Sequence, residues 1–229
     1  MSANSSASAC GGAEAVSGSD PVNGGAAAPP PRALFLVGAS LELIDLAEQL
    51  GWQVRGVIES HPAGADYHGY PVCGDDAWLL AQPLAPAERR VVIAPDLPVV
   101  RRRIFERYAA AGFEIVTLNA ARVKPGTTLG TGCVIAEGAH VSVNCRLGRG
   151  VRLNCRANLM HDCRVGDFCT VAPNAVVLGR VTLEDEVYIG ANATILPDLT
   201  VGRGATVGAG AVVTQDVPPG RVVKGVPAR

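Results

Sequence analysis

The second half of this 229-residue chain repeats every six residues, and this period constrains the fold more than any other feature. The hexads run without interruption from residue 123 to residue 217. If roughly a third of residues were aliphatic, so many consecutive aliphatic first positions would arise by chance about once in 10^7 sequences or more rarely. The first positions are Val123, Leu129, Ile135, Val141, Leu147, Leu153, Leu159, Val165, Val171, Val177, Leu183, Ile189, Ile195, Val201, Val207 and Val213.

The other hexad positions complete the pattern of a β-helix, in which short strands wind into stacked coils. The fifth position is small or apolar from Thr127 to Val217, and the fourth is rich in Gly, Asn and Asp, which favour left-handed turns. Three hexads make one triangular coil, so residues about eighteen apart share a face. We therefore predict a left-handed parallel β-helix over residues 122–229, whose open ends and flat flanks favour self-association.

The N-terminal half has an α/β pattern. Residues 33–37 read as a buried strand, and a helical pattern follows that Ser40 can cap and Gly51 can end. A second strand at 53–58 completes a βαβ unit of the nucleotide-binding type. Further elements are expected at 91–94 (strand), 99–111 (helix) and 114–118 (strand). We predict a Rossmann-like domain over residues 33–121, preceded by a low-complexity, disordered tail over residues 1–32.

Composition narrows the function classes. The formal charge of −1 gives no electrostatic bias toward nucleic acid or anionic membranes. Because the sequence shows neither a transmembrane run nor a secretory signal, we expect a cytoplasmic protein. Seven cysteines are an odd number without C-x-x-C spacing, so no metal is expected. Four of them fall on the fifth-position ladder as small core residues: Cys133, Cys145, Cys163 and Cys169.

Three segments together carry a family resemblance. These are the first strand followed by Gly38-Ala39-Ser40, the turn Met160-His161-Asp162-Cys163 inside the hexads, and the C-terminal Gly225-Val-Pro-Ala-Arg229. Over residues 33–229 the chain resembles bacterial sugar acetyltransferases, which include UDP-4-amino-sugar and perosamine N-acetyltransferases and sialic acid O-acetyltransferase-like proteins. The resemblance implies a homotrimer with acetyl-CoA in the groove between neighbouring prisms. It also implies that the N-terminal domain holds a nucleotide sugar.

His161 is the candidate catalytic residue. As the third residue of its hexad it leaves the interior, and Gly179, one coil further on, is expected to leave open space beside it for a thioester. In the resembling enzymes this histidine is a general base, a role that imidazole suits because its pKa lies near neutrality. Asp162 matches an acidic neighbour that raises the basicity of the histidine. From the residues alone, a surface histidine without a catalytic role is the competing interpretation.

The resemblance also implies cofactor contacts. Gly179 would lie near the acetyl group, and small residues would border the pantetheine arm at Gly190, Ala191, Gly208 and Ala209. Packing alone also favours small residues in a hexapeptide prism. Thr170 stands where several amino-sugar enzymes have a second histidine, so a hydrogen bond from this position to the cofactor would here come from a hydroxyl.

The N-terminal domain departs from the family pattern. The family often reads Gly-Ala-Gly-Gly-His or Gly-Ala-Ser-Gly-His after the first strand, whereas this chain has Gly38-Ala-Ser-Leu-Glu42. The candidate substrate-binding residues are Ser40 and Glu59, where Glu59 replaces a more usual Asp. Pro95-Asp96 replaces a Gly-Asn or Gly-Asp element. In the alternative interpretation, this domain only packs on the trimer.

We predict an acetyl-CoA-dependent acetyltransferase that acts on the amino group of a nucleotide-linked amino sugar in surface glycan biosynthesis. Transfer would be direct, with His161 as general base, because no cysteine or serine is evidently paired with it as a nucleophile. Three alternatives remain: O-acetylation of a sialic acid-like sugar or another hydroxyl acceptor, a zinc-dependent carbonic anhydrase-like prism, and a non-catalytic trimeric scaffold. The zinc alternative requires three converging histidines, whereas the prism contains His140 and His161.

Overall fold

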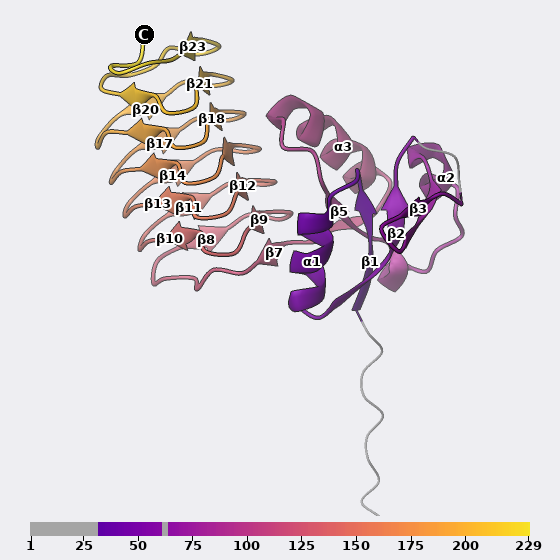
Figure 1. Cartoon of the computed structure of the whole chain (residues 1–229). Helices are drawn as coiled ribbons and strands as arrows, with labels where there is room; N and C mark the ends of the chain where they lie inside the picture. The colour runs from indigo at the N-terminus through magenta and orange to yellow at the C-terminus, as the bar shows by residue number, and fades with distance from the viewer. Residues whose placement is uncertain (1–31, 61–63) are drawn as a thin grey trace, which may run out of the picture. The chain divides into compact units, whose positions relative to one another are not determined.

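The computed structural model describes residues 32–60 and 64–229 (Figure 1). The described residues form one compact unit. The tail predicted for residues 1–32 lies outside the described residues, except that Arg32 begins the first strand. Among the described residues no helix is both long and apolar enough to cross a membrane.

The α/β part contains one sheet with the strand order β3-β4-β2-β1-β5-β6. The pairs are parallel except for the antiparallel β3–β4 pair. The predicted βαβ unit is present, while the elements between residues 66 and 88 were not predicted. The bounds are β1 (Arg32–Val37), α1 (Leu41–Gln49), β2 (Trp52–Ile58), β3 (Asp66–Tyr67), β4 (Tyr70–Gly74), α2 (Asp76–Leu80), the 3-10 helix η1 (Pro86–Glu88), β5 (Arg90–Ile93), α3 (Pro98–Ala110) and β6 (Glu114–Ile115).

Helices cover both faces of this sheet. Leu43 and Ile44 of α1 pack on one face, and Phe105 and Tyr108 of α3 pack on the other. The Oγ of Ser40 accepts a hydrogen bond from the backbone N of Leu43 at 3.3 Å, which caps α1 as predicted. Strand order reverses between β1 and β5, and ligands of open α/β sheets bind at the carboxyl ends of strands at such a point.

The hexads form a prism of two-residue strands, all paired in parallel (Figure 1). We call its sheets face 1 (β10-β13-β16-β19-β22), face 2 (β8-β11-β14-β17-β20) and face 3 (β7-β9-β12-β15-β18-β21-β23). The bounds are β7 (Leu118–Asn119), β8 (Thr128–Leu129), β9 (Val134–Ile135), β10 (His140–Val141), β11 (Arg146–Leu147), β12 (Arg152–Leu153), β13 (Asn158–Leu159), β14 (Arg164–Val165), β15 (Thr170–Val171), β16 (Val176–Val177), β17 (Thr182–Leu183), β18 (Tyr188–Ile189), β19 (Thr194–Ile195), β20 (Thr200–Val201), β21 (Thr206–Val207), β22 (Val212–Val213) and β23 (Val222–Val223).

The predicted register of eighteen residues is confirmed: on face 1, His140 pairs with Asn158, which pairs with Val176. The fourth hexad position has positive φ in every hexad from Gly126 to Gly210, even where the residue is Arg156 or Phe168. First- and fifth-position side chains form one continuous core along the prism. Strand β7 already belongs to face 3, although the predicted domain boundary lies at residue 121.

Two of the prism's three corners carry the residues of interest. We call the turns between face 1 and face 2 the His161 corner; they comprise residues 142–145, 160–163, 178–181 and 196–199. We call the turns between face 3 and face 1 the pocket corner; they comprise residues 136–139, 154–157, 172–175, 190–193 and 208–211. The α/β part contacts face 3 through hydrogen bonds to Arg152 and Thr170.

Candidate active site

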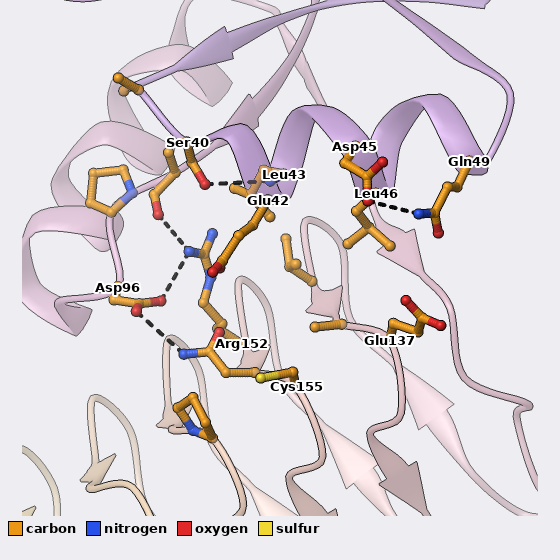
Figure 2. Close-up of a pocket in the computed structure, with 18 of the residues that line it drawn as sticks. Ser40, Glu42, Leu43, Asp45, Leu46, Gln49, Asp96, Glu137, Arg152 and Cys155 are labelled. Carbon is orange, nitrogen blue, oxygen red and sulfur yellow. Dashed lines mark hydrogen bonds and ion pairs between the residues drawn. The ribbon is translucent and has the colours of Figure 1, made fainter. Parts of the chain in front are cut away.

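A pocket of about 800 Å³ lies between the start of α1, the carboxyl ends of β1 and β5, and the pocket corner (Figure 2). Both predicted substrate-binding residues, Ser40 and Glu59, line it. Asp96, which follows β5, also lines it, as does Glu137 on the prism. Three parts of the N-terminal domain depart from the family pattern: the Gly38–Glu42 loop, Glu59 and Pro95-Asp96. The structure brings all three to one cavity that borders the prism.

Arg152 is the prism residue whose hydrogen bonds join the two sides of this pocket. Its side chain extends from β12 and is 5% exposed. The Nη1 atom donates to the carbonyl of Ala94 and to the carboxylate of Asp96, and Nη2 donates to the carbonyl of Ile93 at 2.7 Å. Burial lowers the pKa of Arg152, and the neighbouring Asp96 carboxylate opposes that shift.

Thr170 lies in the same contact between the two parts of the chain. Its side chain is fully buried, its hydroxyl accepts from Nη2 of Arg101 at 2.8 Å, and it donates to the Asp96 carbonyl at 2.7 Å. Arg101 of α3 also donates to the Gly150 and Phe168 carbonyls. Within one chain the Thr170 hydroxyl therefore serves packing, and its predicted contact with the cofactor stays a prediction.

His161 lies on the His161 corner with its side chain 43% exposed. Its Nδ1 lies 2.8 Å from Oδ2 of Asp162, whose Oδ1 accepts from Nδ2 of Asn144 at 3.2 Å. The hydrogen bond to His161, followed by that to Asn144, holds the pKa of Asp162 below its usual range. An ionised Asp162 selects the tautomer with hydrogen on Nδ1, which leaves Nε2 free to accept a proton.

The space beside Gly179 is filled, although the sequence predicted that it would be open. A Cβ built on Gly179 would lie 2.6 Å from Cε1 and 2.7 Å from Nε2 of His161, so the imidazole itself occupies the space that was expected to be open. The physical reason is that residues one coil apart stack directly, and the ring of His161 leans over the next turn. Gly179 thus admits the imidazole, and a thioester would have to approach from the other side of the ring.

The remaining predicted cofactor residues lie on the other corner. Gly190, Ala191, Gly208 and Ala209 belong to the turns that follow β18 and β21, on the pocket corner. A Cβ on Gly190 would lie 2.6 Å from the backbone N of Ala209, so coil stacking alone requires this glycine. Ala191 is half-buried and Ala209 is exposed, which leaves small surface residues along this corner. Within one chain, these residues and His161 do not form a single site.

Sequence reasoning missed Arg101 and Arg152. Arg152 occupies the sixth hexad position, as do Arg146 and Arg164, which are exposed on face 2. Only the packing of the α/β part against face 3 distinguishes them, so no signal in the prism sequence could have singled out Arg152. Among the described residues, no group of three His, Cys, Asp or Glu side chains is placed to hold a metal ion.

Comparison with known proteins places this geometry in a family. The model of the bacterial transferase hexapeptide (six repeats) matches residues 144–179 and 180–215. A search of curated protein sequences found no significant match.

Three solved structures are similar over most of the chain. The acetyltransferase domain of PglB from Neisseria gonorrhoeae in complex with acetyl coenzyme A is 32% identical, with a TM-score of 0.79, covering 87% of this chain and 98% of that one. PerB from Caulobacter crescentus in complex with CoA and GDP-perosamine is 28% identical, with a TM-score of 0.79 and coverages of 86% and 96%. WeeI from Acinetobacter baumannii is 28% identical, with a TM-score of 0.79 and coverages of 86% and 98%.

These similarities extend through both the α/β part and the prism, and two of the three structures contain CoA or acetyl-CoA. They support an enzyme over the scaffold alternative, because the similar structures include acetyltransferases. The chain belongs to the bacterial sugar acyltransferases with a left-handed β-helix of hexapeptide repeats, and it is an acetyl-CoA-dependent acyltransferase.

Proposed function

We propose that this protein transfers the acetyl group of acetyl-CoA to the amino group of a nucleotide-linked amino sugar, with His161 as general base. The observation that carries the proposal is the His161–Asp162 pair: the Asp162 carboxylate contacts Nδ1 of an accessible imidazole, so Nε2 is the ring nitrogen that remains for the acceptor's proton. The Caulobacter crescentus relative was solved with CoA and GDP-perosamine and is described as a GDP-perosamine N-acetyltransferase, which supports an amine acceptor. The roles of His161 and Asp162 are our assignment.

In this mechanism, Nε2 of His161 removes a proton from the acceptor amine as its nitrogen attacks the thioester carbonyl. The new C–N bond forms, the C–S bond breaks, and the imidazolium returns the proton to the departing CoA sulfur. Asp162 keeps the ring oriented and stabilises the imidazolium, although it does not itself take up the proton. Gly179 keeps the turn beside the ring free of a side chain that would displace it.

We further propose that the working enzyme is a homotrimer in which each site is shared between neighbouring subunits. His161 and Gly179 lie on one corner of the prism, whereas the pocket and Ala191 lie on another. A neighbouring copy that brings its His161 corner against the pocket corner would complete the site, with acetyl-CoA in the groove between the two prisms. In this arrangement Gly208 and Ala209 would border the pantetheine arm, and Ser40 and Glu59 would bind the acceptor.

The biological setting follows from the proposed acceptor. Nucleotide-linked amino sugars are activated precursors, so the product would serve the assembly of surface glycans. We also propose that the enzyme acts in the cytoplasm, as expected from the sequence.

A panel assay tests the acceptor class. The purified protein is given acetyl-CoA with UDP-, GDP- and CMP-linked amino and hydroxy sugars, and CoA release is measured. We expect turnover with a nucleotide-linked amino sugar and much less with the matched hydroxy sugar. Turnover with hydroxy sugars alone would contradict the amine assignment.

A further inference from the structure

Face 2 carries two exposed arginines side by side. Arg146 of β11 and Arg164 of β14 lie directly opposite each other in the sheet. Arg149 and Arg203 nearby are each paired with an aspartate, whereas neither Arg146 nor Arg164 forms an ion pair with a described residue. Like charges directly opposite on neighbouring strands repel each other, so this pair does not stabilise the prism by itself.

The two arginines line a groove of about 630 Å³ on face 2. In the same outward row, Thr128 and Thr182 flank them with hydroxyl groups. The carboxylates at the edge of the groove are already engaged: Asp185 pairs with Arg203 at 2.8 Å, and Glu184 accepts from the backbone N of Arg203 at 2.7 Å. Guanidinium and hydroxyl groups are donors that bind phosphate oxygens, so this row suits a phosphate group.

The pocket between the α/β part and the prism is acidic instead (Figure 2). Its lining contains one arginine, Arg152, whose Nη atoms are bonded to the α/β part. Carboxylates accept hydrogen bonds from hydroxyl and amino groups and repel phosphates. The pocket of one chain therefore suits the hydroxyl and amino groups of a nucleotide-linked sugar but not its diphosphate. The lining carboxylates are those of Glu42, Asp45, Glu59, Asp96 and Glu137.

The arginine pair lies at the level where the missing positive charge is needed. Arg164 follows His161 by three residues, so their Cα atoms are at most about 11 Å apart. Asn154, which lines the pocket, belongs to the same coil of the prism. A cyclic assembly with its axis along the prism keeps equal coils of neighbouring copies at equal height. A His161 corner that meets the neighbouring pocket would therefore bring Arg164 to the height of that pocket.

The same levels separate the acceptor from the cofactor. Gly208 and Ala209, proposed to border the pantetheine arm, follow the pocket residue Asn154 by three coils. Arg146 lies in the opposite direction, one coil before Arg164. Because the CoA phosphates are at the far end of the pantetheine arm, the arginine pair suits a diphosphate of the acceptor better than that of CoA.

We propose that Arg146 and Arg164 are specificity-determining residues that bind the diphosphate of an acceptor whose sugar lies in the pocket of the neighbouring subunit. This inference rests on the proposed function, because it takes the acceptor as nucleotide-linked and the site as shared. The two guanidinium groups donate to the non-bridging phosphate oxygens, and the bound anion relieves the repulsion between them.

Equilibrium binding tests this assignment without turnover, so its result does not depend on the acetyltransferase assay. Isothermal titration compares UDP and GDP with uridine and guanosine on the full chain and on two variants, Arg146→Gln and Arg164→Gln. Each variant should bind the diphosphates about 10-fold more weakly and the nucleosides unchanged. The melting temperature should stay the same or rise, because the like-charge pair is removed.

The matched control is Arg103→Gln, which removes an exposed arginine of α3 and should bind UDP and GDP like the unmodified protein. Titration with CoA distinguishes the other source of a diphosphate, and its affinity should not change in either variant. Weaker CoA binding with unchanged UDP and GDP binding would overturn the proposal, as would an equal loss of nucleoside binding or an equal effect of Arg103→Gln.

Failure of this inference can be told apart from failure of the proposed function. Turnover of a nucleotide-linked amino sugar, together with unchanged UDP and GDP affinities in both variants, would overturn the role of the arginine pair alone. An unmodified protein that binds neither UDP nor GDP and acetylates no sugar linked to either would overturn both.

Discussion

The contact between His161 and Asp162 is short, local and solvent-accessible, so it can be changed without disturbing the core. Both side chains are more than two-fifths exposed, and the Asp162 backbone adopts the left-handed conformation of its hexad position, with φ +61°. This turn geometry sets the carboxylate beside Nδ1 of the preceding residue. The pair thus arises from the repeat itself and needs no support from the α/β part.

Asp162→Asn should lower kcat about 10-fold, because an amide orients the ring less well and does not neutralise the imidazolium. The pKa of Asp162 is lowered by its hydrogen bond to His161, so the carboxylate is protonated only as the pH falls below its usual range. Between about pH 8 and about pH 9, above the range in which imidazole ordinarily titrates, the ratio of the two kcat values should therefore stay constant. A ratio that titrates within that interval would contradict the assigned ionisation state.

A Thr170→Val variant tests whether the Thr170 hydroxyl stabilises the packing of the α/β part on the prism or binds the cofactor. The change leaves the Arg101 guanidinium and the Asp96 carbonyl each short of one buried partner, which should lower the free energy of unfolding by about 1–3 kcal/mol. Denaturant unfolding measures this loss, with Thr182→Val as the control, because Thr182 holds the same hexad position and is half-buried on face 2. A stability loss no larger than that of the control, with a raised KM for acetyl-CoA, would favour the cofactor role.

At the scale of elements, the prism could be predicted from the sequence because each hexad position has one physical task. Aliphatic first positions, small fifth positions and left-handed fourth positions are all visible without tertiary information. The start of α1 was also predictable, since Ser40 caps it locally. By contrast, Arg152 and Thr170 are buried because the α/β part covers face 3. They occupy the same hexad position as the exposed Arg146, so the repeat alone does not predict their burial.

The fourth-position rule predicts a stabilising substitution. Arg156 is exposed and has φ +58°, a conformation that costs residues with a Cβ about 1–2 kcal/mol and glycine almost nothing. Arg156→Gly should raise the free energy of unfolding by up to about 1 kcal/mol, after the entropy cost of glycine. Arg156→Val should lower it, because β-branched residues tolerate positive φ poorly. Thermal unfolding of both variants in parallel checks the rule, and a more stable Val variant would refute it.

In the whole molecule, the proposed active site forms where two different corners of the prism meet across neighbouring copies. The corner that carries His161 and the corner that borders the pocket are separated by face 1, so within one subunit His161 lies apart from the pocket. A parallel β-helix has flat faces that a cyclic assembly can cover.

Subunit mixing tests this sharing. His161→Ala lacks the proposed base, and Ala39→Trp should block the pocket, which Ala39 lines as an exposed residue. Each variant alone should be inactive. If the two are unfolded and refolded together, about a quarter of the interfaces should combine an intact His161 with an intact pocket, and activity should return to that extent. Mixed samples that stay as inactive as the separate variants would exclude a shared site.

We assign His161 as the general base, and single-turnover acetyl transfer measures its contribution to the chemical step. His161→Ala should slow the chemical step about 10²- to 10⁴-fold while leaving acetyl-CoA binding and the melting temperature nearly unchanged, since the side chain lies outside the core. His68→Asn, at an exposed turn, serves as the matched control. A His161→Ala rate within a few-fold of the unmodified protein would rule out His161 as the general base.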